Sequence, residues 1–200
     1  MTARSPQTFV ERLRARGVAR SRDIENWGVS RRDLARLVDR GVVERLSRGL
    51  YAAPGGTLSG HDDLIAAAIR VPKGVISLLS ALRFHDLTTQ SPHEVWMAIG
   101  EKDWRPCVAH PPIRFVRFSG AAQREGIEIH EISGVSVPVY SPAKTVADCF
   151  KYRRVIGLDV AIEALRDFLR DRRGSVDDLW RYAKICRVAR TMRPYIESLA

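Results

Sequence analysis

The sequence predicts an α+β protein: an N-terminal winged helix-turn-helix followed by an α+β domain with a small mixed or antiparallel sheet flanked by helices. Residues 1–55 contain three short runs at helical spacing, each followed by a glycine, and then two strand-like runs. Residues 57–200 contain β-branched or aromatic runs as well as long amphipathic runs. Because Pro54-Gly55-Gly56 is typical of a linker, we expect domains at residues 1–55 and 57–200.

The first domain is expected to begin with three helices. Their predicted ranges are residues 8–16, 21–27 and 30–40. Ser21 and Ser30 stand where N-cap residues are preferred, and Gly17, Gly28 and Gly41 stand where helices commonly end. Leu34, Leu37 and Val38 of the third helix lie at helical spacing and should face the core.

A basic hairpin should follow the third helix. The runs VVERL and LYAA flank Ser47-Arg48-Gly49, which predicts two short strands and a tight turn with an arginine at its tip. Three helices and a hairpin within about 50 residues are typical of a winged helix, in which the third helix recognises DNA.

The second domain should combine strands and helices. Strands are predicted in EVWMAI, IRFVRF, IEIHEI and residues 135–139, the last two joined at Ser133-Gly134, with a further short strand before Leu79. Helices are predicted from Ser59 to about Ile69, around Leu79–Phe84, from Ser141-Pro142 onward, over GLDVAIEALRDFLRDRRG, and over SVDDLWRYAKICRVARTM. This order favours helices packed on a sheet.

The charge of the chain favours a polyanionic partner. Net charge is +10 and the isoelectric point is about 10.1. Residues 1–55 carry 12 arginines and 6 acids, residues 56–142 have net charge −1, and residues 143–200 have net charge +5. The positive charge is therefore at the two ends, and nucleic acid is the first class of partner to consider.

Other classes of protein are disfavoured by composition. No apolar run approaches the roughly 18 residues that would span a membrane, and the first residues do not resemble a secretory signal, so we expect a cytoplasmic protein without a membrane partner. Cys107, Cys149 and Cys186 are far apart and never form a CxxC pair, which argues against a disulfide framework or a zinc site. We expect no metal and no cofactor.

The third helix carries the candidate DNA-reading residues. If Leu34 faces the core, Arg31, Arg32 and Arg36 must face outward, and a helix that enters the major groove by its N-terminal end presents such positions to base edges. An arginine can grip guanine O6 and N7 with two hydrogen bonds. At Ser30, the N-terminal end of the helix would offer free backbone N–H groups to a phosphate.

Further candidate contacts flank this helix: Arg20, Arg22, Arg45, Arg48 and Tyr51. Arg45 and Arg48, on or near the hairpin, would contact backbone phosphate or the minor groove, and Arg20 and Arg22 would contact phosphates that flank the site. Tyr51 could stack on the sugar-phosphate backbone, but it could equally pack the hairpin against the helices. Arginines on an amphipathic helix are also common as a merely solvated face.

A second basic surface is predicted near the C-terminus. Its candidates are Arg166, Arg170, Arg173, Arg187 and Arg190, whose spacing allows two shared helix faces. These faces would extend a DNA contact or meet an acidic or RNA-bound protein. Alternatively they are solvated and paired locally, since Glu163 precedes Arg166 and Asp167 precedes Arg170 by three residues.

No catalytic residue is expected. The candidates are His61-Asp62-Asp63, His85-Asp86, and the pair Glu128 and His130, which would point the same way on a strand. Such a carboxylate–imidazole pair could bind a divalent cation, but it is more often ordinary surface. No P-loop, GxSxG or HExxH motif is present.

The stretch GVSRRDLARLVDRGVVERLSRGLYAAP resembles the N-terminal winged-helix domain of AbiEi-type antitoxins, which are prokaryotic transcriptional regulators. GVISLLSALRFHDLT, HEVWMAI and VYSPAKTVADCFKYRRVIGLDVAIEALRDFL resemble the second domain of that family. The resemblance implies a recognition helix at Ser30–Arg40 and a wing at Val43–Ala52, and supplies no catalytic residue.

The resemblance also implies a function. Such antitoxins repress their own operon by binding inverted repeats in the promoter, and they counteract a co-expressed nucleotidyltransferase-like toxin. Two alternatives remain open: a regulator without a toxin, whose second domain dimerises or senses a ligand, and a metal-dependent nucleic-acid-processing enzyme that uses the winged helix for docking.

Overall fold

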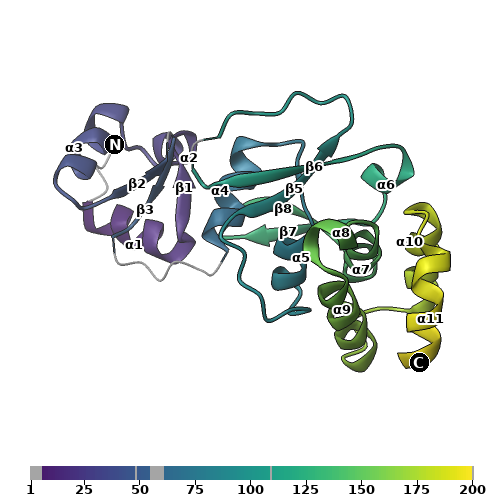
Figure 1. Ribbon diagram of the computed structural model, residues 1–200. Helices are drawn as coiled ribbons and strands as arrows, with labels where there is room; N and C mark the ends of the chain where they lie inside the picture. The colour runs from purple at the N-terminus through teal and green to yellow at the C-terminus, as the bar shows by residue number, and fades with distance from the viewer. Residues whose placement is uncertain (1–5, 48, 55–60, 109, 200) are drawn as a thin grey trace. The chain divides into compact units, whose positions relative to one another are not determined.

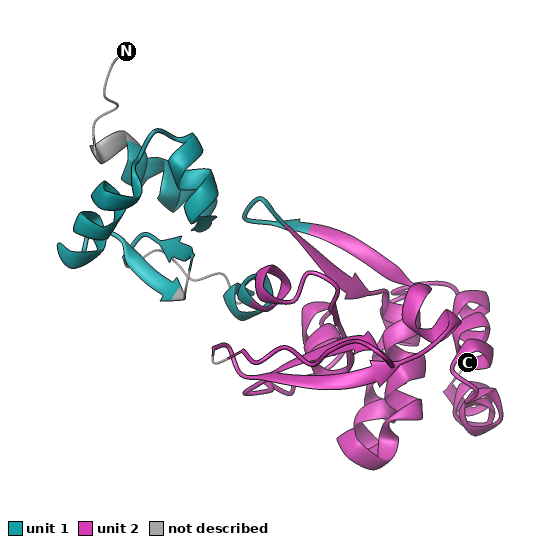
Figure 2. Cartoon of the chain, turned by 90° about the horizontal axis from the view of Figure 1, so that it is seen from above, with its two compact units in different colours: residues 1–66, 131–135 teal, residues 67–130, 136–200 magenta. Residues whose placement is uncertain are grey.

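The chain divides into two compact units of unequal size. The computed structural model describes residues 6–47, 49–54, 61–108 and 110–199 (Figure 1). The first unit comprises residues 1–66 with residues 131–135, and the second comprises residues 67–130 and 136–200 (Figure 2). The domain boundary predicted near residues 55–57 falls largely on residues outside the described part of the chain.

The first unit has the predicted winged-helix elements. Its helices are α1 (Pro6–Arg16), α2 (Ser21–Asn26) and α3 (Arg31–Asp39), and its strands are β1 (Val18–Arg20), β2 (Glu44–Ser47) and β3 (Leu50–Ala52). The strands form an antiparallel sheet in the order β1-β3-β2. The hairpin was predicted, whereas β1 was not: Val18 pairs with Ala52, so the turn between the first two helices supplies a third strand.

Local capping chemistry sets the helix ends of this unit. The Ser30 hydroxyl accepts a hydrogen bond from the backbone N–H of Asp33 at 3.1 Å, as predicted for the N-cap of α3. Gly41, at φ +68°, provides the left-handed conformation that lets the chain leave α3. The prediction that Ser21 caps α2 is wrong. Arg20 is the N-cap, and its own N–H donates to the carboxylate of Asp23 at 3.4 Å.

A small apolar core holds the three helices against the hairpin. Its buried members include Phe9, Leu13, Ile24, Leu34 and Val43. Each helix contributes at least one of these side chains. The orientation of α3, and hence of its exposed face, is therefore fixed by burial rather than by its surface charges.

The second unit is built on a mixed five-stranded sheet. Its strands are β4 (Val75–Ile76), β5 (Val95–Gly100), β6 (Ile113–Phe118), β7 (Ile127–Ile132) and β8 (Val135–Tyr140), in the order β6-β5-β4-β8-β7. β4 pairs antiparallel with β5 and parallel with β8, and β5 pairs parallel with β6. The α+β class is confirmed, and of the two predicted kinds of sheet the mixed one is observed.

Helices follow and separate these strands. By the division given above, the first turns of α4 and residues 131–135, where β7 and β8 meet, are counted with the first unit. They are α4 (Asp62–Arg70), α5 (Leu78–Phe84), α6 (Ala121–Arg124), α7 (Pro142–Lys151), α8 (Arg153–Ile156), α9 (Leu158–Arg170), α10 (Val176–Ile185) and α11 (Ala189–Leu199). The core joins sheet residues such as Trp96 and Phe118 to Phe150 of α7 and Phe168 of α9. The start of α4 predicted at Ser59 lies outside the described residues.

The C-terminal helices differ from the prediction. One helix was expected over residues 175–192, but the chain forms α10 and α11, because Arg187 adopts a left-handed φ of +61° between them. The turn is stabilised by the N–H of Val188, which donates to the carbonyl of Ala183 at 2.8 Å. The Ser175 cap of α10 and the Ser141-Pro142 start of α7 are confirmed.

A buried ion pair lies inside the second unit. The ammonium of Lys144 is 2.5 Å from the carboxylate of Asp148, one turn further along α7, and both side chains are fully buried. The thiol of Cys186 donates to the other oxygen of Asp148 at 3.1 Å, which ties α7 to the end of α10. Burial raises the pKa of Asp148, and the neighbouring Lys144 opposes that rise.

The loop after β5 holds a tryptophan in water. One guanidinium nitrogen of Arg117 donates to the carbonyls of Gly100, Glu101 and Asp103 at 2.6–3.0 Å. The Asp103 carboxylate also accepts from the N–H of Gly100 at 2.8 Å. These bonds order the start of the loop, and Trp104, the next residue, is 88% exposed.

Among the described residues, no helix has the length and apolar content to cross a membrane.

Candidate nucleic-acid interface

Helix α3 presents one apolar and one basic face. Leu34 is only 2% exposed, and Leu37 and Val38 pack partly against the same core. Arg31, Arg32, Ala35 and Arg36 are all exposed on the remaining surface of α3. The outward orientation predicted for the three arginines is therefore what the structure has, because the core fixes which side of α3 faces inward.

Arg31 is held by an acid from the preceding helix. Its Nε donates to Oε1 of Glu25, a residue of α2. The Arg31 side chain is 83% exposed, whereas that of Glu25 is 33% exposed, so the acid is the less accessible member of the pair. The hydrogen bond from Arg31 to Glu25 raises the pKa of Arg31. The pair uses the Nε of the guanidinium, and its terminal nitrogens remain available as donors on a largely exposed side chain.

The other two arginines of α3 differ in their partners. Arg36 lies 3.4 Å from the Asp33 carboxylate, one turn before it. The same carboxylate accepts a 2.7 Å hydrogen bond from the Ser30 hydroxyl, so Ser30 and Asp33 form one capping network. Arg32 is exposed and makes no ion pair within the described part of the chain. Of the three, Arg32 has the fewest competitors for a bound polyanion.

The flanking candidates are distributed over β1, α2 and the hairpin. Arg20 is half-buried at the end of β1, and Arg22 is exposed in the first turn of α2. Arg45 is exposed on β2, whereas Arg48 lies outside the described residues. Tyr51 is half-buried on β3 and packs against the core of the unit, which favours the packing interpretation of this residue.

The second basic surface is less regular than the spacing predicted. Arg166 and Arg170 are exposed on α9, but Arg173 lies beyond the end of that helix, because Arg172 turns the chain at φ +49°. Likewise, Arg187 lies in the turn after α10, and Arg190 belongs to α11. The prediction that each group shares one helix face is wrong for these two groups.

The candidate catalytic residues include one close pair in the described part of the chain. Glu128 and His130 do lie together on β7, with 3.4 Å between Oε2 and Nε2. His85 is buried, and its Nε2 is 2.7 Å from the carbonyl oxygen of Tyr140. Burial lowers the pKa of His85. Across residues 6–47, 49–54, 61–108 and 110–199, no three His, Cys, Asp or Glu side chains are grouped so that they could hold a metal ion.

Comparison with known proteins finds a family match within the first unit. Residues 9–54 match a family described as "Transcriptional regulator, AbiEi antitoxin". A crystal structure of the RV2827C protein from Mycobacterium tuberculosis shares the fold, with a TM-score of 0.58 and 15% identity over 88% of this chain and 71% of that chain. No protein with a curated description matches the sequence. The matched segment runs from α1 to just after β3.

Proposed function

We propose that this chain, whose residues 9–54 carry the domain of the AbiEi antitoxin family of transcriptional regulators, represses its own operon and counteracts a co-expressed toxin. The observation that carries the DNA-binding part is the exposed basic face of α3, oriented by a buried apolar face in a segment that matches regulators. The antitoxin part rests on the family description.

The proposed docking places the N-terminal end of α3 in the major groove. Arg31 and Arg32 stand in the first turn of α3, and Arg36 stands one turn later. A helix that enters the major groove by its N-terminal end brings its first turn closest to the base edges. Arg31 and Arg32 would therefore contact bases, and Arg36 would contact a base or a phosphate. The free N–H groups at the same end favour phosphate.

The hairpin and α2 would then meet the DNA backbone. Arg45 on β2 and Arg22 on α2 are exposed, and each would neutralise a phosphate flanking the site. Arg20, being half-buried, has less reach, and Tyr51 would mainly support the hairpin from within. Operators of this kind would contain inverted repeats, read by two copies of the chain.

The second part of the proposal concerns the toxin. We propose a nucleotidyltransferase-like toxin encoded beside this chain, with residues 57–200 as the domain responsible for protection. Co-expression in a host whose growth the toxin arrests tests this directly. Rescue by the full chain supports it, and unchanged arrest at confirmed expression of both proteins counts against it.

Operator binding is tested with the DNA upstream of the chain's own gene. Wild type is compared with Arg31→Ala/Arg32→Ala on specific and scrambled duplexes over a salt series. If both arginines read bases, specific binding should weaken by roughly 25-fold or more, since one good arginine–guanine contact discriminates by about fivefold or more. Binding to scrambled DNA should weaken less.

A matched control removes the same charge elsewhere. Arg83 and Arg154 are exposed arginines of α5 and α8, so Arg83→Ala/Arg154→Ala changes net charge equally without touching α3. The proposal requires the control to retain discrimination between operator and scrambled DNA. Equal losses in both double variants would mean that α3 contributes charge alone, and the recognition-helix assignment would fail.

A further inference from the structure

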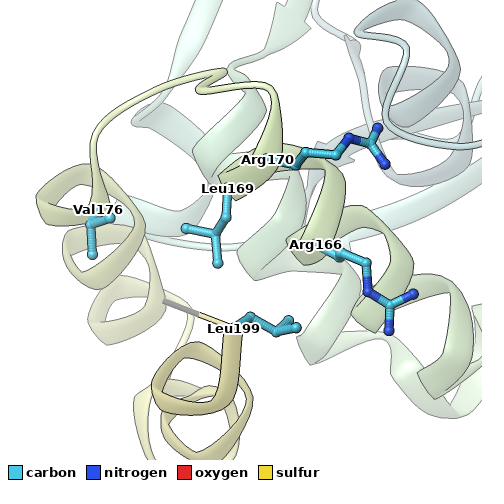
Figure 3. Close-up of a pocket in the computed structure, with 5 residues that line it drawn as sticks. All are labelled: Arg166, Leu169, Arg170, Val176 and Leu199. Atoms are coloured by element: carbon cyan, nitrogen blue, oxygen red, sulfur yellow. The ribbon is translucent and has the colours of Figure 1, made fainter.

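The second unit contains an open groove between its last three helices. The groove has a volume of about 400 Å³ and is lined by Arg166 and Leu169 of α9, Arg170 at its end, Val176 at the start of α10 and Leu199 of α11. Figure 3 shows the three apolar side chains around the open space and both arginine side chains beside it, with their guanidinium groups directed outward, away from the apolar ones. The lining thus combines an apolar floor with a basic rim.

The two arginines of the rim differ in whether they are paired with acidic side chains. Arg170 is held by two acids: its guanidinium is 2.8 Å from the carboxylate of Asp167 and binds that of Asp171 through two nitrogens at 2.8 and 3.1 Å. Arg166 is exposed and, within the described part of the chain, has no acidic partner. Arg166 therefore offers an uncompensated positive charge at the edge of the groove.

Other apolar side chains on the same side of α9 as Leu169 are also partly exposed. Leu158, Ile162 and Leu169 fall on one side of this helix, because they are spaced by four and seven residues. Leu158 is 38% exposed, Val176 is 42% exposed, and Ile162 and Leu169 are only partly covered. The first and last of these α9 positions are separated by about 16 Å along the axis, the length of three turns of a partner helix.

We propose that this groove binds an amphipathic acidic segment of another protein. Its apolar side chains would lie against Leu169, Val176 and Leu199, and a carboxylate would pair with Arg166. An arginine beside an apolar surface is typical of residues that contribute strongly to interfaces. Its guanidinium can donate two parallel hydrogen bonds to one carboxylate, and its aliphatic stem adds apolar contact area. The proposal goes beyond operator binding and stands whether or not α3 binds DNA.

The lining argues for protein over nucleic acid as the occupant. Single-stranded nucleic acids are bound by aromatic side chains on which bases stack, and none of the five residues lining the groove is aromatic. A phosphate backbone would satisfy Arg166 but would leave the leucines and the valine against polar oxygens. An acidic segment with leucine-like side chains satisfies both parts of the lining.

The test begins with selection of a random 12-residue peptide library on the full chain. The expected consensus places an aspartate or glutamate three or four residues from an apolar side chain. A synthetic peptide of that consensus should bind wild type and should bind Arg166→Glu at least about tenfold more weakly, the loss expected when one central charged contact becomes repulsive. Arg166→Glu should in turn select peptides with a basic residue at that position.

Two further variants separate the groove from general charge effects. Val176→Asp introduces an acid into the groove at the first residue of α10, a position that tolerates acids in folded helices, and should also weaken the peptide about tenfold. Arg190→Glu makes the same charge change as Arg166→Glu on exposed α11, outside the groove lining, and should bind the peptide as wild type does.

Three kinds of result would overturn the proposal. One is failure of the peptide test, either a consensus without an acid or equal peptide binding by wild type and Arg166→Glu. Another is a loss of DNA affinity in Arg166→Glu beyond that of Arg190→Glu, which would assign the groove to nucleic acid. The third is a change of oligomeric mass in Arg166→Glu by light scattering, which would assign it to a second copy of this chain.

Discussion

Glu25→Gln separates two roles that an acid can have beside DNA. Glu25 accepts the hydrogen bond from Arg31 Nε, and the arginine is far more exposed than the acid. If Glu25 only repels phosphate, its neutralisation should improve binding to every DNA. If it holds Arg31 in the orientation that reads a base, neutralisation should improve binding to arbitrary DNA but reduce discrimination. The two roles therefore predict different changes in the ratio of affinity for the operator to affinity for scrambled DNA.

The magnitudes follow from the geometry. One carboxylate fewer in a surface that meets phosphates should raise affinity for scrambled DNA about two- to threefold at 0.1 M salt, where charges interact over about 10 Å. One aligned arginine–guanine contact is worth about fivefold or more in discrimination. Because a neutral acceptor holds Arg31 less tightly than a carboxylate, the arginine must be ordered in part at each binding event, and the ratio of specific to scrambled affinity should fall about three- to tenfold.

Fluorescence anisotropy with labelled operator and scrambled duplexes at several salt concentrations measures the affinity for scrambled DNA and the ratio of specific to scrambled affinity. Glu44→Gln is the matched control, since Glu44 is exposed on β2 and is not the partner of Arg31. Glu44→Gln should raise affinity for both duplexes and leave their ratio unchanged. If Glu25→Gln does the same, Glu25 does not position Arg31, and the reasoning is refuted.

Three other predictions concern the second unit. Lys144→Met should lower the free energy of unfolding in urea by about 3–5 kcal/mol, because it leaves the Asp148 carboxylate buried without its charged partner. Adding Asp148→Leu should restore part of that stability, and purely additive losses would contradict the pairing. Burial lowers the pKa of His85, so the folded state resists its protonation and stability should fall as pH drops below about 6.5; His85→Gln should flatten this decline between pH 7.5 and 5.5, and an unchanged slope would exclude His85 as its source. Exposed Cys107 should react rapidly with a thiol reagent at pH 8, whereas Cys186, whose pKa burial raises to about 12, should react only after unfolding; rapid modification of Cys186 in the folded chain would contradict its burial.

Local signals made the first unit predictable from sequence. Glycine after each apolar run gave the helix ends, and Ser30 gave the start of α3, because left-handed turns and N-caps restrict which residues fit. β1 was missed because a strand of three residues shows no alternation of its own and exists by pairing with β3. Ser21 was misassigned because Asp23 supplied the capping acceptor instead.

Other features depended on contacts that sequence spacing does not show. No glycine or proline marks the break at Arg187, where the turn is made by an arginine in a left-handed conformation. Glu25 and Arg31 belong to two different helices, so helical spacing rules do not pair them. Lys144 and Asp148 do stand at paired helical spacing, but lysine is normally exposed, and only the packing around α7 reveals that this pair is buried.

The exposed tryptophan after β5 makes the second unit its own optical reporter. Trp104 stands in water on an ordered loop, whereas Trp96 is 4% exposed within the core. The indole of Trp104 should therefore emit at long wavelength and account for most of the acrylamide quenching from this unit, with a smaller share from half-buried Trp180, while Trp96 emits from an apolar environment. A blue shift with reduced quenching, absent in Trp104→Phe, would report coverage of this loop without any attached dye.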